Sequence, residues 1–397
     1  MTRPPQPSRP LPRTVVVLGC VSLLNDFASE MVVPLIPLLL ATVLAAGPAA
    51  LGLIEGVADA VSNLLKLWAG RRSDAPGARR KPFVVIGYLL SNIARPLIGI
   101  SGSWLTVLTI RITDRIGKGV RTAPRDALLA DVIVDGQAGR AYGLTRALDH
   151  TGAVIGALAA AAIVYFGTER LEVVIALSAI PGIAAVLLIA VAVKEPHRHV
   201  ADAPPASLPR WSALPPRLQR YLLTLGLFML GRIPETFLLL RGHELGMSVV
   251  ELLLFWAALH VVKASLSEFA GRLADRVGRR PIIAGGWLVY AAMLFALAFI
   301  DSPAGLWGFG LALGLYFGLS EGAERALVRD LAHAAERGTA FGWYHMVAGI
   351  SAIPAGLFLG GVWSYVDATA AFTASAAFTA LATVGFLRWA PAGSALT

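Results

Sequence analysis

Long apolar runs alternate with short polar segments along almost the whole chain. An α-helix needs about 20 apolar residues to cross a bilayer, and most of the runs reach that length. The pattern predicts a polytopic all-α membrane protein with twelve transmembrane helices. The predicted spans are residues 15–44, 49–70, 82–102, 104–122, 141–166, 172–193, 218–240, 248–270, 281–300, 304–323, 340–362 and 366–389.

The composition agrees with the pattern. Of the 397 residues, 56% are hydrophobic and only 15% are charged, whereas soluble domains carry about 25% charged residues. This excludes an ordinary soluble enzyme and a disordered chain. The single cysteine, Cys20, excludes a disulfide bond within the chain.

The longest polar stretch divides the chain into two parts. Residues 194–217 are rich in proline and charge, so we interpret them as a cytoplasmic linker between two six-helix bundles, 14–193 and 218–397. We interpret the proline-rich residues 1–13 as a disordered cytoplasmic tail. The bundles also resemble each other, because the spacing Gly70-x-x-x-Asp74 recurs as Gly271-x-x-x-Asp275, 201 residues later. Two parallel repeats are typical of carriers whose site lies between them.

Charge sets the expected orientation. The net charge is +9, and the basic residues gather in alternate loops, such as residues 71–81 and 276–280. By the positive-inside rule these loops and both termini face the cytoplasm. We therefore expect a multi-pass protein of the bacterial inner (plasma) membrane.

Two carboxylates in the first span stand out as candidates for proton coupling. Asp26 and Glu30 are four residues apart, so they share one helix face. Two carboxylates that lie close together in a low dielectric repel, so one tends to hold a proton. The alternative is a hydrogen-bond network between helices that includes Arg115.

Other polar side chains within the spans are expected to face a substrate cavity, because such groups are costly in lipid. They are Asn25, Arg111, Arg146, Asp149, His150, Arg232, Glu235, His260, Lys263, Glu324 and His345. Each can also be a structural ion pair or hydrogen bond. A cluster of Asp149 and His150 with Asp26 and Glu30 would suit a metal ion, and this leaves a metal or metal-chelate (siderophore-type) transporter as an alternative function.

Two short loops carry the clearest motif. Each follows an apolar run and combines glycine, aspartate and arginine at similar spacing. These loops resemble the signature motif of the major facilitator superfamily, which implies a latch that stabilises one conformation. The latch residues are Gly70, Asp74 and Gly77 in the first loop and Gly271, Asp275, Arg276, Gly278 and Arg279 in the second.

The fourth span adds a second resemblance. Arg115-Ile-Gly-Lys118-Gly119 is similar to the superfamily motif whose buried arginine is tied to proton coupling. The resemblance extends to a bacterial branch of permeases and drug-efflux-like carriers. It implies the fold of that superfamily and proton-coupled secondary transport of a small molecule by rocker-switch alternating access.

The remaining expectations concern partners. The chain has no G-x-x-x-x-G-K-[ST] run for ATP and no recognisable nucleophile set, so we expect no enzyme activity and no cofactor. The expected partners are a small-molecule substrate, protons and the lipid bilayer, with no nucleic acid, and we expect a monomer.

Overall fold

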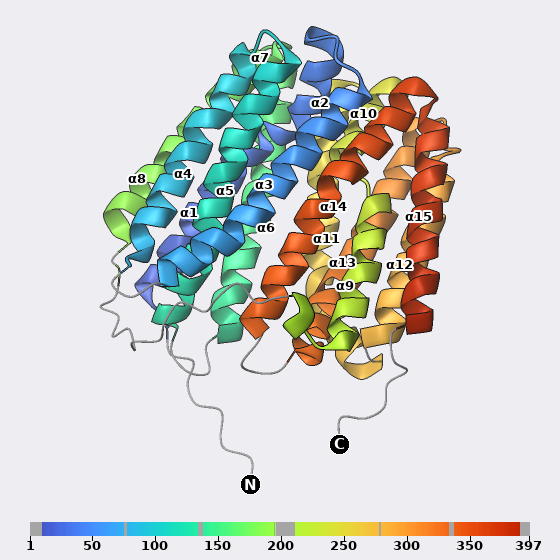
Figure 1. Cartoon of the computed structure of the whole chain (residues 1–397). Coiled ribbons are helices and arrows are strands. Elements are labelled where there is room, and N and C mark those ends of the chain that lie inside the picture. The colour runs from blue at the N-terminus through green and yellow to red at the C-terminus, as the bar shows by residue number, and fades with distance from the viewer. Residues whose placement is uncertain are drawn as a thin grey trace.

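The computed structural model describes residues 10–74, 78–133, 138–193, 195, 211–277, 279–332 and 337–389. It is a helical bundle in two halves that lie side by side (Figure 1). The N-terminal half contains α1 (Arg13–Glu30), η1 (Val33–Leu35), α2 (Ile36–Leu38), η2 (Leu39–Val43), α3 (Pro48–Asp74), α4 (Arg80–Leu97), η3 (Ile98–Ile100), α5 (Trp104–Val132), α6 (Ala138–Phe166), α7 (Leu171–Leu177) and α8 (Ala179–Ala192). The C-terminal half contains η4 (Trp211–Ala213), α9 (Pro216–Gly231), α10 (Thr236–Glu244), α11 (Val249–Val277), α12 (Arg279–Leu297), α13 (Pro303–Leu331), α14 (Arg337–Tyr365) and α15 (Ala368–Trp389).

These elements form the twelve predicted spans, each of which we call a rod, and confirm the predicted fold class. Within the described ranges, nine helical segments are long and apolar enough to cross a membrane. The other three rods, α5, α11 and α13, each have 29 residues, which at 1.5 Å per residue is about 40 Å and exceeds the hydrocarbon thickness. The largest boundary difference is in α5, which ends at Val132 instead of residue 122. The apolar run stops at residue 122, but the helix continues through Pro124 to Val132.

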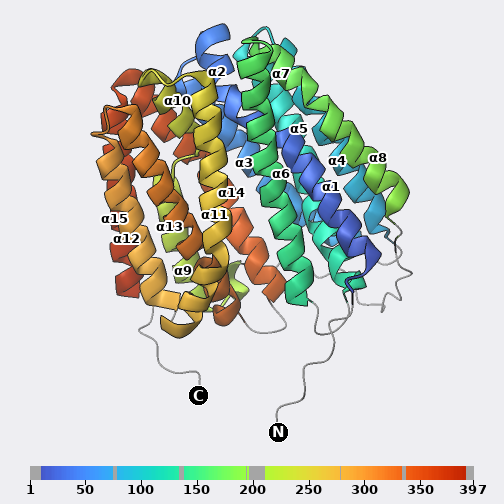
Figure 2. The ribbon, with the colours of Figure 1, turned by 180° about the vertical axis from the view of Figure 1, so that it is seen from behind.

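α1 begins and α15 ends at the same end of the bundle, which we name the terminal end (Figure 1). The other end, where α3 begins and α14 ends, is named the opposite end. α6 of one half and α11 of the other diverge towards the terminal end (Figure 2).

The first rod of each half is broken. α1 ends at Glu30, and a turn, a 3₁₀ stretch, α2 and a five-residue π-helix follow. In the C-terminal half, α9 ends at Gly231 and α10 begins at Thr236. Each break contains a proline, Pro34 or Pro234, which lacks the N–H that would continue a helix. The two breaks lie 200 residues apart, close to the offset of the sequence repeat.

The opposite end is sealed by contact between α3 and α14. A Cβ atom at Gly52 would lie 2.0 Å from the backbone oxygen of Gly356, and one at Gly356 would lie 2.1 Å from that of Gly52. Only glycine permits such close approach of two backbones. Nearby, the backbone N–H of Ala49 donates to Ser364 Oγ at 3.0 Å. The two halves are therefore in backbone contact at this end.

The halves differ in their interiors. The core of the C-terminal half is aromatic: Phe228 stacks on Trp287 with ring centroids 4.2 Å apart. The N-terminal half instead buries charged side chains, among them Arg111, which is fully buried. This difference determines where the polar groups of the candidate site lie.

Candidate functional site

A cavity of about 450 Å³ lies between the two halves. Its wall combines residues of α3 and α5 with residues of α11, α14 and the break between α9 and α10. The polar and charged lining residues are Glu55, Asp59, Asn63, Lys66, Arg115, Lys118, Arg232, Glu235, Thr236, Trp256, Tyr344 and His345. The volume suits a small molecule, since ligand pockets commonly measure about 300–1,000 Å³.

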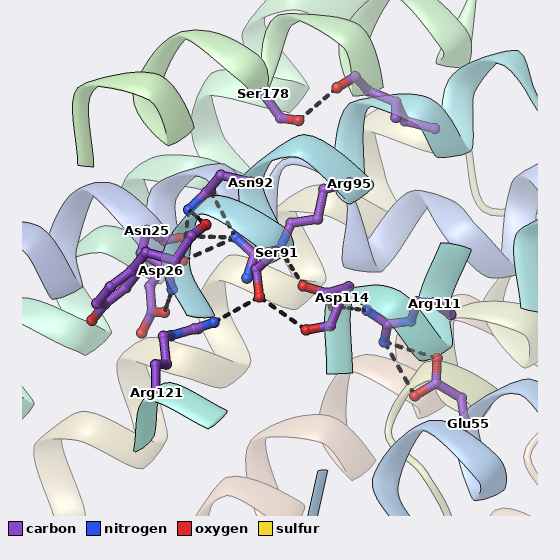
Figure 3. A network of polar contacts seen from close by, with 12 residues as sticks. Asn25, Asp26, Glu55, Ser91, Asn92, Arg95, Arg111, Asp114, Arg121 and Ser178 are labelled. Carbon is purple, nitrogen blue, oxygen red and sulfur yellow. Dashed lines mark hydrogen bonds and ion pairs between the residues drawn. The ribbon is translucent and has the colours of Figure 1, made fainter. Parts of the chain in front are cut away.

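Behind the cavity, four charged side chains form a network in the N-terminal half (Figure 3). Asp114 of α5 accepts from Arg95 Nε at 2.9 Å and from Arg111 at 3.2 Å. Arg111 also donates to both oxygens of Glu55, at 3.1 and 3.4 Å. All four side chains are almost completely buried. Two cations and two carboxylates balance here, so the network joins α3, α4 and α5 without net charge.

Neutral side chains extend this network towards α1 (Figure 3). Arg95 donates to the backbone and side-chain oxygens of Asn25, both at 3.2 Å. Asn25 in turn donates to Asp26 Oδ1 at 2.9 Å. Arg121 reaches Ser91 Oγ at 2.7 Å and lies over the ring of Tyr88, 4.6 Å from its centroid. Asn25, Asp26 and Arg111 therefore belong to one structural network beside the cavity, not to its lining.

Glu30, the last residue of α1, makes a polar contact between the halves. The indole Nε1 of Trp256 on α11 donates to Glu30 Oε2 at 2.8 Å. His260, one turn further along α11, places its Nε2 3.7 Å from the same oxygen, and its ring meets that of Trp256 edge-on. Glu30 thus connects the break in the first rod to α11 of the C-terminal half. Its partner there, Trp256, lines the cavity.

Glu235 and Lys263 form an ion pair within the C-terminal half. Glu235 belongs to the break between α9 and α10 and lines the cavity, whereas Lys263 lies on α11. Arg232 precedes it in the same break, and His345 of α14 completes this wall. These three lining residues and Arg115 are the predicted site residues that reach the cavity surface.

Other predicted site residues lie elsewhere. On α6, Asp149 is buried and Arg146, 63% exposed, approaches it at 4.0 Å. His150 is half-buried on the same helix. Glu324 is buried in the aromatic core of the C-terminal half, where Trp287 Nε1 donates to it at 2.7 Å. In the described part of the chain, no three side chains of the types histidine, cysteine, aspartate and glutamate gather as a metal site.

The predicted latch is only partly visible. Gly70 packs closely against α5, where a Cβ atom would lie 3.2 Å from that of Ala123. Arg279 Nε lies 3.5 Å from Asp330 Oδ2. Gly77 and Gly278 lie outside the described residues, as do the side chains of Asp74, Asp275 and Arg276 and the surroundings of Gly271.

Several lining residues were not among the predicted site residues, although Glu55, Asp59 and Asn63 were recognised as polar residues within the spans. Glu55, Asp59, Asn63 and Lys66 are spaced three or four residues apart on α3 and share the face that meets α14. This helical spacing was the available signal. Thr236 and Trp256 gave none, because single uncharged residues in apolar runs are common.

Comparison with known proteins identifies the family. The sequence model of the Major Facilitator Superfamily matches residues 18–266 and 221–395. The chain belongs to this superfamily. An uncharacterised MFS-type transporter of Methanocaldococcus jannaschii is 30% identical over 367 residues, which cover 89% of each chain. An uncharacterised protein of Mycobacterium bovis is 30% identical over 353 residues, covering 87% of this chain and 84% of its own.

Solved structures of this superfamily share the fold. A variant of the nucleoside transporter NupG superposes with a TM-score of 0.79 at 13% identity, covering 95% of this chain and 99% of its own. A D-xylose-proton symporter gives 0.72 at 15% identity, covering 96% and 98%. At these identities the likeness extends to the fold alone. The chain is thus a multi-pass membrane transporter of the superfamily, as its motifs implied.

Removal of the shared carboxylate tests the buried network. Asp114→Asn leaves Arg95 and Arg111 buried without their common counter-charge, so the free energy of unfolding should fall by about 3–5 kcal/mol. The matched control is Asp126→Asn, whose side chain is 51% exposed beside Arg125 and should matter by less than about 1 kcal/mol. Reversible unfolding in mixed detergent micelles measures both. Equal losses in the two variants would contradict the structural role of the network.

Proposed function

We propose that the protein carries a small molecule across the membrane by alternating access, with the cavity between the halves as the binding site. The observation that carries the proposal is the lining itself, to which both halves contribute polar groups and which reaches the break of each first rod, at Val33 and at Arg232–Glu235. Residues at helix breaks near the centre of repeat interfaces are where secondary transporters bind their cargo. Separation of α3 from α14 at the opposite end would expose the cavity to the other side.

We further propose that protons drive the cycle through Glu30. An ionised Glu30 accepts a charge-assisted hydrogen bond from Trp256 across the interface, and such bonds are roughly twice as strong as neutral ones. Glu30 lies at the C-terminal end of α1, where the helix dipole is negative and disfavours the ionised carboxylate. Protonation of Glu30 would therefore weaken the contact between the halves. His260 faces it from α11, and Arg115 acts on it electrostatically from α5.

Asp26 and Arg115 have supporting roles in this proposal. Asp26 is tied to Asn25 on the far side of the network, so its contact does not cross between the halves. Arg115 provides a fixed positive charge near Glu30, Glu55 and Asp59. The coupling group is therefore the carboxylate whose hydrogen bond joins the two halves.

The terminal end faces the cytoplasm in this proposal, because Arg71 and Arg72 at the end of α3 and Arg279 and Arg280 at the start of α12 lie there. In a Cys20→Ala background, an impermeant thiol reagent added to intact cells should label Ser302→Cys at the opposite end. It should not label Arg72→Cys at the terminal end. Both positions are exposed. The reversed labelling pattern would overturn the orientation.

A reversible cross-link tests transport and does not require the cargo to be identified first. Ala49→Cys and Ser364→Cys, in the Cys20→Ala background, would join α3 to α14 at the sealed end. Proteoliposomes given a bacterial metabolite extract should accumulate at least one component under a pH gradient, as detected by mass spectrometry. Oxidation should abolish that accumulation, and reduction should restore it. Accumulation that continues in the fully cross-linked protein, or no accumulation by the unlinked protein, would contradict the proposal.

Replacement of Glu30 tests proton coupling. Glu30→Gln keeps a hydrogen-bond acceptor for Trp256 but cannot gain or lose the proton, so gradient-driven accumulation should be lost while exchange between preloaded and external cargo persists. Glu169→Gln, an exposed acid at the opposite end, is the matched control and should behave as wild type. Should Glu30→Gln retain full accumulation while Asp26→Asn loses it, the coupling group is Asp26.

A further inference from the structure

The cavity lining contains charged side chains of both signs. Four cationic side chains line it, Lys66, Arg115, Lys118 and Arg232, against the acids Glu55, Asp59 and Glu235. Two of these acids are bound by cations from outside the lining. Arg111 holds Glu55, and Lys263 holds Glu235. Asp59 is the remaining acid that faces the lining cations.

Arg115 and Lys118 are three residues apart on α5, so both lie on the helix face that lines the cavity. Repulsion between like charges is strong where the surroundings are apolar and the dielectric constant is low. A bound anion would offset this repulsion, whereas a bound cation would increase it.

Two buried polar atoms on facing walls have no hydrogen-bond partner among the described residues: Arg115 Nε in the N-terminal half and Thr236 Oγ1 in the C-terminal half. Arg115 is 9% exposed and Thr236 is 3% exposed. Buried polar groups of this kind normally have a partner. Anionic oxygens can accept from both, since a guanidinium N–H and a hydroxyl are donors.

The backbone adds a third contribution. α10 begins at Thr236 and has nine residues, and Thr236 lines the cavity. The N-terminus of a helix carries a partial positive charge and favours anions. The partial positive charge at the start of α10 therefore lies at the cavity lining.

We propose that the cavity binds a small organic anion through carboxylate or phosphate oxygens. Arg115 and Lys118 bind it from the N-terminal half, and Thr236 binds it from the C-terminal half. This assignment of a substrate class rests on the transport function proposed above.

Binding to the full-length protein in lipid nanodiscs tests the assignment. The probes are two matched pairs: succinate with neutral succinamide, and glucose 6-phosphate with neutral glucose. Isothermal titration calorimetry measures the binding of each probe. The pairs also distinguish carboxylate from phosphate. At least one anion should bind at millimolar concentration, and its neutral partner should bind at least about tenfold more weakly.

Variants assign that binding to the cavity. Lys118→Gln should weaken anion binding about tenfold or more, and Thr236→Val, which removes only the hydroxyl, should weaken it by a smaller factor. Lys81→Gln at the terminal end is the matched control and should leave affinity unchanged, because Lys81 lies outside the lining and donates to the backbone of Ala190. Equal binding of anions and neutral partners, failure of both anions to bind, or an unaffected Lys118→Gln would each overturn the assignment.

The outcome separates this assignment from the transport function. If the cross-link experiment reveals accumulation of a neutral or cationic component and neither anion binds, the protein is a transporter and the substrate class is wrong. If an anion binds in a Lys118-dependent way but nothing accumulates, the anion site stands and the transport mechanism is wrong.

Discussion

Arg95 and Arg111 share the carboxylate of Asp114 within the N-terminal half, and Arg111 also forms an ion pair with Glu55. A bilayer offers no water to satisfy such groups, so each buried charge must find its partner within the protein. The network therefore fixes α3, α4 and α5 relative to one another. It also neutralises Glu55 and leaves Arg115 and Lys118, on the same helix as Asp114, to set the charge of the cavity.

The C-terminal half, which faces α3 and α5 across the cavity, is stabilised differently. Its core is aromatic, and its first rod is interrupted at Arg232–Glu235, directly at the cavity. Contacts between the halves are of two kinds. At the opposite end, glycine backbones of α3 and α14 meet without side chains between them, a packing that can separate and reform with little rearrangement. Behind the cavity, Glu30 and Trp256 contribute a polar contact whose strength depends on the charge of one carboxylate.

The hydrophobic pattern was sufficient to predict the twelve rods, because each span is long and apolar, and the repeated Gly-x-x-x-Asp motif indicated the family. The pairing of charges was not predictable to the same degree. Asp114 and Arg111 are three residues apart on α5, a spacing that brings side chains together on a helix, but the second partner of Asp114 is Arg95 on α4. Glu30 was identified as a carboxylate on a helix face, yet its contact with Trp256 lies 226 residues away. The break at Pro234 was readable only by comparison with Pro34, since the repeat offset aligns the two prolines.

The central claim is that the two halves move against each other about the cavity. Two pairs of spin labels in lipid nanodiscs test it most directly, with Arg72→Cys and Arg217→Cys reporting the terminal end and Ser103→Cys and Ser302→Cys reporting the opposite end. All four positions are exposed, and each pair joins the two halves. The account predicts two populations of distances for each pair, with lengthening at one end accompanied by shortening at the other as pH or ligand changes. A single unchanging distance at both ends, or distances that lengthen together, would contradict it.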